Sequence, residues 1–126
     1  MTIAHHRLHI TAEWILDYAK SIEAPLQTIN NLLIAPVTMP IIFWQQFDIP
    51  WLKKDTLLIH GSQSFSYELP ISAGMILDCE LSLAKIEKKT SRQGELTLFT
   101  HTLVCKCNEE HIVTAETVLI LIGDGV

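Results

Sequence analysis

Long β-prone stretches fill the second half of the chain, and they constrain the fold more than any other feature. Four apolar, β-branched stretches separated by turn signals cover residues 56–69, 75–88, 95–107 and 111–122. Gly94 and Asn108 lie in the short connections 91–94 and 108–110, and both residues tolerate a positive φ. Pro70 and Gly74 separate the first two stretches. The pattern predicts an antiparallel sheet.

One amphipathic helix precedes these strands. Thr11 suits an N-cap, and apolar side chains recur at helical spacing up to Ile22, before Pro25 ends the helix. Tyr18 and Ile22 are therefore expected to be buried against the sheet. The proline-containing stretch 25–40 predicts an irregular connection, and a second short helix is expected over Ile41–Phe47. A helix followed by a sheet indicates an α+β fold, with residues 1–126 as one domain.

Composition narrows the function classes. Hydrophobic residues make up 48% of the chain and charged residues 18%, so part of the apolar surface is expected in a subunit interface, with sheet edges pairing in a dimer. A net charge of -5 argues against nucleic acid and anionic membranes as partners. Apolar stretches are too short to cross a bilayer and the N-terminus does not resemble a signal peptide, so a cytoplasmic protein is expected.

The cysteines and histidines do not predict a metal site or a cofactor. Cys79, Cys105 and Cys107 are an odd set, expected to be reduced and mostly packed. Cys105 and Cys107 share a strand face and lack the loop geometry of a zinc motif. The remaining candidates are five scattered histidines without a completing carboxylate or thiolate: His5, His6, His9, His101 and His111.

Three segments carry a family resemblance. They read ILDYAKSI over residues 15–22, LIAPVT over 33–38, and HGSQSFSY over 60–67, followed by Pro70 and Gly74. In order and spacing they resemble the N-terminal hot-dog domain of MaoC-like dehydratases, a FAS1-like dehydratase domain. The resemblance implies a long central helix wrapped by a curved antiparallel sheet. It also implies side-by-side dimers that bind acyl thioesters, on coenzyme A or an acyl carrier, near the subunit interface.

The catalytic pair of the wider family is replaced here. Active members carry Gly-Asp-x-Asn-Pro-Leu-His, whose Asp and His handle protons during hydration of a double bond conjugated to a thioester. The equivalent stretch reads SIEAPLQ over residues 21–27, so Ile22 stands in place of the Asp and Gln27 in place of the His. Isoleucine cannot transfer a proton, and glutamine does not titrate. The resemblance thus points to a subunit without the usual dehydratase mechanism.

Two other residues are candidate proton-transfer groups. Glu23 is one residue from the expected Asp position, although a one-residue step on a helix turns a side chain by about 100°. His60 is a candidate base or ligand to a thioester carbonyl, and the alternative is a hydrogen bond to nearby backbone or to Gln63. Candidate substrate-binding residues are Gln27, Gln63, Trp44, Lys85 and Lys88. For the tryptophan the alternative is core packing, and for the lysines a solvated hairpin tip.

Three functions fit these residues. The first is a supporting subunit of a (3R)-hydroxyacyl dehydratase or enoyl hydratase, in a heterodimer with a hot-dog chain that carries the motif. The second is a stand-alone acyl-CoA thioesterase that uses Glu23 or Asp17 to activate water. The third is a non-catalytic homodimer that binds an acyl ligand.

Overall fold

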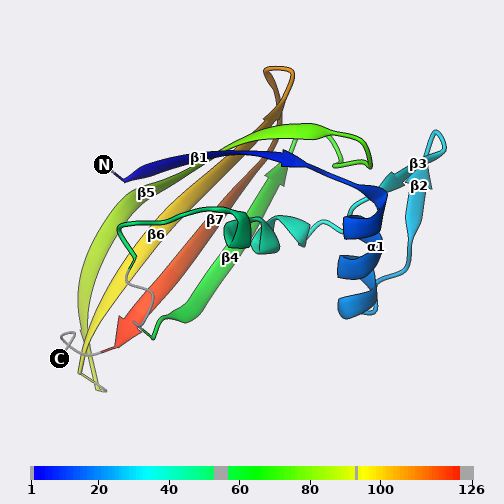
Figure 1. Ribbon diagram of the computed structural model, residues 1–126. Helices are drawn as coiled ribbons and strands as arrows, with labels where there is room; N and C mark the ends of the chain where they lie inside the picture. Colours follow the sequence, from blue (N-terminus) through cyan, green and yellow to red (C-terminus); the bar gives the residue numbers. More distant parts are fainter. Residues whose placement is uncertain (1, 53–56, 93, 123–126) are drawn as a thin grey trace.

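The body of the protein is a five-stranded antiparallel sheet in the order β1-β5-β6-β7-β4 (Figure 1). The computed structural model describes residues 2–52, 57–92 and 94–122. The strands are β1 (Ile3–His9), β4 (Ile59–Tyr67), β5 (Ile76–Ser91), β6 (Gly94–Cys107) and β7 (Glu110–Ile122). The four predicted strands and their antiparallel pairing are confirmed. Thr56, where the first was predicted to begin, and Gln93, in the predicted turn, lie outside the described residues.

The turns between the long strands use the backbone conformations expected from the sequence. Gly94 opens β6 with φ of 110°, and Asn108 and Glu109 join β6 to β7 with φ of 50° and 66°. Two consecutive positive φ values define the tight hairpin turn whose twist matches that of the flanking strands. Gly74, with φ of 95°, lies between β4 and β5 as predicted.

Helix α1 (Ala12–Ser21) follows the predicted pattern at its start but not at its end. Thr11 caps it by accepting a hydrogen bond from the backbone N–H of Trp14 over 3.1 Å. Tyr18 is buried, and its hydroxyl lies 2.7 Å from Oγ1 of Thr38. Ile22, however, is 44% exposed, so its predicted burial is wrong. Ile22 is the C-cap residue, and its backbone has left the helical conformation. Its side chain therefore does not continue the buried face of the helix.

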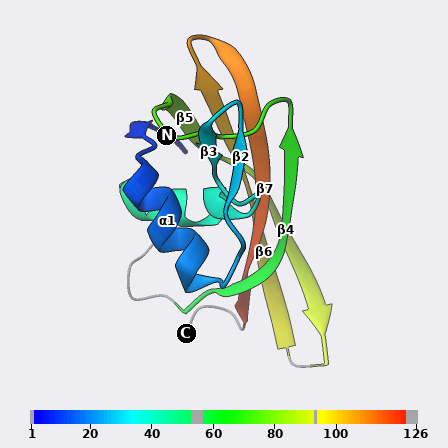
Figure 2. The same cartoon turned by 90° about the vertical axis from the view of Figure 1, so that its right-hand side faces the viewer.

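A 3₁₀ helix, η1 (Met39–Gln46), replaces the predicted short helix over Ile41–Phe47. Figures 1 and 2 show α1 and η1 on the same side of the curved sheet, called the inner face below. Met39 and Phe43 of η1 are fully buried. The resemblance implied a long central helix, whereas α1 has ten residues and η1 supplies much of the inner cover.

Two elements are absent from the sequence prediction. Strand β1 pairs with β5 through a segment rich in histidine, of which only Leu8 is buried. The stretch predicted as irregular contains a small hairpin, β2 (Gln27–Ile29) with β3 (Leu32–Ile34). Asn30 and Asn31 form its turn with φ of 52° and 64°, a role that asparagine fills readily.

Apolar side chains from the inner face, α1 and η1 form one core. Its largest fully buried members include Ile10, Ile15, Phe43, Leu77 and Leu103. Among the described residues, no helix is long and apolar enough to span a membrane.

Candidate functional site

A row of polar side chains crosses the apolar inner face. Gln63 of β4 lies opposite Thr117 of β7, which lies opposite His101 of β6. Directly opposed residues share a face of the sheet, so the three side chains are neighbours. Thr117 donates a hydrogen bond to Oε1 of Gln63 over 2.6 Å. Thr117 and His101 are buried and Gln63 is half-buried, so the row runs from the core to an edge strand.

His101 is enclosed by aromatic side chains. Nε1 of Trp51 donates a hydrogen bond to Nε2 of His101 over 2.9 Å, and Trp44 packs edge-on with a ring-centre distance of 4.9 Å. Because Nε2 accepts, the neutral ring carries its proton on Nδ1. Nδ1 is buried and has no hydrogen-bond partner within the described part of the chain. Burial lowers the pKa of His101, because the charged imidazole would lose its hydration in the core.

A β-bulge aligns His60 with this row. Residues three apart on a regular strand point to opposite faces. The register shifts between His60 and Ser62, so His60 lies opposite Leu119 while Gln63 lies opposite Thr117. Leu119 and Thr117 are two apart on β7, so His60 and Gln63 face the same side. Gly61 permits the bulge, because a Cβ there would lie 2.6 Å from Cδ1 of Ile120 and 3.2 Å from a backbone oxygen of β7.

The candidates near the end of α1 lie away from His60. Glu23 is exposed and adopts φ of 56° in the turn after the helix, and Gln27 is the exposed first residue of β2. Figure 1 shows α1 and β2 at one end of the molecule, whereas β4 begins at the other. The fold of a single chain therefore does not bring Glu23 and His60 together.

The two candidate lysines point to opposite faces of the sheet. A second register shift, between Leu83 and Lys85, places Lys85 opposite Thr100, next to the inward-facing His101. Lys85 consequently faces outward, where it forms an ion pair with Glu87. Lys88 lies three residues further along β5 and therefore faces the inner side of the sheet, where β5 pairs with β6. These lysines do not form one basic patch.

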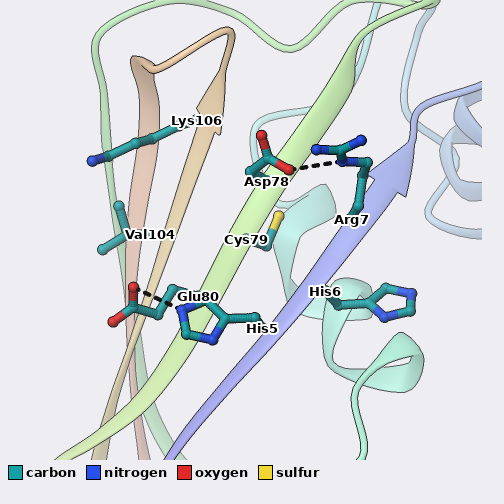
Figure 3. A pocket seen from close by; sticks show the side chains of 8 residues that line it. All are labelled: His5, His6, Arg7, Asp78, Cys79, Glu80, Val104 and Lys106. Atoms are coloured by element: carbon teal, nitrogen blue, oxygen red, sulfur yellow. Dashed lines mark hydrogen bonds and ion pairs between the residues drawn. The ribbon is translucent and has the colours of Figure 1, made fainter.

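A shallow groove of about 670 Å³ lies across β1, β5 and β6 on the outer face (Figure 3). Its charged walls are self-paired: Arg7 contacts Asp78 over 2.9 Å, and His5 contacts Glu80 over 3.2 Å. Lys106 also lines it. Because Arg7 and His5 are already paired with carboxylates on the same face, the inner-face row is the stronger candidate site.

Sequence reasoning missed His101 as part of a site and considered it only among scattered histidines. The available signal was the spacing of His101 from the inward-facing apolar residues of its own strand, which is always an even number of residues. Phe99, Leu103 and Cys105 lie an even number of residues from His101 along β6, so all four share one face, and threonines flank His101 on both sides. Its contacts with Trp44 and Trp51 depend on tertiary packing, which this periodicity does not reveal.

A curved antiparallel sheet with helical segments along its inner face defines the hot-dog class of proteins. Solved structures agree. A C-terminally truncated HadBC (3R-hydroxyacyl-ACP dehydratase) complex from Mycobacterium tuberculosis has a chain that matches with a TM-score of 0.76 and 17% identity, over 94% of this chain and 93% of that one. An (R)-hydratase from A. caviae involved in PHA biosynthesis matches with a TM-score of 0.63 and 16% identity, over 94% and 93%.

The family follows from the sequence match. Residues 1–115 match the family described as FAS1-like, dehydratase domain region, and the chain belongs to this family. A UPF0336 protein from Thermobifida fusca (strain YX) is 33% identical over 99 residues, which cover 74% of this chain and 63% of the relative. The chain thus spans less than two thirds of that relative's length. The hot-dog fold and the dehydratase-family resemblance are confirmed.

Proposed function

We propose that this protein is a supporting subunit of a (3R)-hydroxyacyl dehydratase or enoyl hydratase. It binds the acyl thioester and leaves proton transfer to a partner chain. The observation that carries the proposal is the replacement of the motif's Asp and His by Ile22 and Gln27. Both side chains are exposed, and neither is a proton-transfer group.

The inner face carries side chains suited to contact an acyl thioester. Trp44 is partly buried against the core beside the polar row, which suits it to pack against an acyl chain. Nε2 of Gln63 contacts only the carbonyl of Ser64, over a long 3.4 Å, among the hydrogen bonds of the described residues. This amide N–H is therefore available to a thioester carbonyl. His60, exposed on the same side, is a second polar group near that position.

The sheet edges suggest how a partner binds. Strands β1 and β4 are the two edges, and each exposes backbone groups able to pair with another chain. The polar row ends at Gln63 on β4, so pairing at that edge would place the partner beside the proposed thioester contacts. The similar HadBC chain comes from a complex, and another similar structure is that of the ChsH1-ChsH2 complex. These precedents support a heterodimer with a motif-bearing hot-dog subunit.

The test is copurification from the native host followed by assays on enoyl and 3-hydroxyacyl thioesters. We expect a complex with a chain carrying Gly-Asp-x-Asn-Pro-Leu-His, hydratase activity of the complex, and none from the isolated subunit. Gln63→Ala in the complex should raise KM more than it lowers kcat, whereas the exposed Ser66→Ala on the same strand should change neither. Thioester cleavage by the isolated chain would instead support the thioesterase alternative, and stable homodimers without turnover the acyl-binding one.

A further inference from the structure

Two buried cysteines face each other in the core. Cys79 of β5 and Cys105 of β6 are directly opposed in the antiparallel register. Cys79 donates its S–H to the sulfur of Cys105 over 3.2 Å. They are 2% and 0% exposed, and both are free thiols. Directly opposed residues have Cα atoms about 4.5 or 5.5 Å apart, which lies within the span a disulfide bridges.

We propose that Cys79 and Cys105 are a redox-active dithiol, which hydrogen peroxide converts into an intrachain disulfide linking β5 to β6. The site is independent of the thioester function proposed above. It requires no movement of one strand along the other, because the register already aligns the two residues.

The reaction balances with peroxide as the two-electron oxidant. The Cys79 sulfur, after losing its proton, attacks one peroxide oxygen, the O–O bond breaks, and the first water leaves once the released hydroxide takes up that proton. The sulfur of Cys105 then attacks the resulting sulfenic acid. The S–O bond breaks as the S–S bond forms, and the sulfenic oxygen leaves as a second water after taking the Cys105 proton. The two thiols are oxidised and one peroxide is reduced to two waters.

The surroundings favour a small, uncharged oxidant and a slow reaction. Both sulfurs lie in an apolar core, which excludes charged disulfides such as oxidised glutathione. The contact with the Cys79 side chain and burial together raise the pKa of the Cys105 thiol, so this residue stays protonated at neutral pH. In this scheme Cys79 reacts first and Cys105 closes the disulfide.

The test is oxidation of the folded full chain with hydrogen peroxide, alkylation of remaining thiols, and tryptic mass spectrometry without reduction. Lys106 separates Cys105 from Cys107, so trypsin places the three cysteines on different peptides. We expect a loss of two hydrogens and one linked pair of peptides, containing Cys79 and Cys105. The melting temperature should rise by a few degrees, because the link constrains the unfolded chain.

Variants distinguish this pair from the half-buried third thiol. Cys107→Ala should still form the link, whereas Cys79→Ala and Cys105→Ala should not. As a control, the reduced protein is unfolded in urea and then oxidised under the same conditions. Its cysteine peptides should link without a preference for the Cys79–Cys105 pair. A link through Cys107, a disulfide between two chains, unchanged mass under peroxide, or a lower melting temperature after oxidation would each overturn the proposal.

Discussion

The indole N–H of Trp51 donates a hydrogen bond to Nε2 of His101 over 2.9 Å, and this bond ties the segment after η1 to the middle of the sheet. The bond requires a neutral imidazole, because a protonated His101 would present a second N–H to Trp51. Packing of the segment after η1 on the inner face is therefore linked to the protonation state of the buried His101.

Trp51→Phe should lower the free energy of unfolding by about 1–3 kcal/mol, because it leaves Nε2 of His101 buried without a donor. Trp44→Phe is the matched control. It changes another tryptophan beside the same imidazole, and no hydrogen bond of the Trp44 indole is among those of the described residues. Urea unfolding measures both. Equal losses in the two variants would mean that aromatic packing, and not the hydrogen bond, stabilises this segment.

Stability should fall as the pH decreases below about 6.5, the ordinary pKa of histidine. Burial lowers the pKa of folded His101, so between that lower value and about 6.5 the unfolded chain binds more protons. The contribution of His101 is complete above this window and is lost as the pH falls through it. Within this window, titration of His101 changes the free energy of unfolding by at most about 1.4 kcal/mol per pH unit.

Unfolding in urea at several pH values measures this dependence. His101→Gln keeps an acceptor for Trp51 and removes the titration, so its stability should depend less on pH than that of the wild type. The exposed His9→Gln should leave the wild-type dependence unchanged. Parallel curves for wild type and His101→Gln would argue against the assignment to this imidazole.

Tyr18→Asp should cost more than about 3 kcal/mol, because it places a carboxylate in the core and removes the hydroxyl that contacts Thr38. Ile22→Asp should cost less than about 1 kcal/mol, since Ile22 is 44% exposed. Thermal unfolding of the two variants checks the contrast. Similar, large losses would place Ile22 in the core, as its helical spacing alone suggested.

The sequence predicted the parts of the fold that depend on local patterns. The period of apolar residues located α1 and the four long strands, and Gly94 and Asn108 marked their turns. Strand β1 was not predicted, because a mostly exposed edge strand lacks an apolar alternation. The site was predicted less well. Which face His60 and Lys85 occupy depends on bulges, and a one-residue shift reverses every side chain beyond it.

Gly61→Ala should destabilise the protein by about 1–3 kcal/mol, because the new Cβ would crowd Ile120 and the backbone oxygen of Val118. Ser64→Ala, on the exposed side of the same strand, is the control and should have little effect. Chemical denaturation measures the cost. If Gly61→Ala is as stable as wild type, the bulge does not depend on close approach at this position.

In the proposed alignment Ile22 and Gln27 replace the family's Asp and His, so the purified chain should hydrate crotonyl-coenzyme A no faster than background. Restoring either group alone should leave the rate at background, since acid and base residues that work as a unit are strongly non-additive. Ile22→Asp with Gln27→His should raise it weakly. Both positions are exposed, so neither change disturbs the core.

A continuous assay of the conjugated thioester measures all four proteins, with circular dichroism to confirm folding. The gain should be small, because only a side-chain pair held near a bound thioester reaches a high rate. Robust turnover by the unmodified chain would contradict the supporting role and direct attention to Glu23 and His60. Glu23→Gln and His60→Gln then separate these candidates. The end of α1, near Glu23, and the start of β4, which contains His60, lie at opposite ends of the molecule (Figure 1), so loss of turnover in both variants would place the active site across a subunit interface.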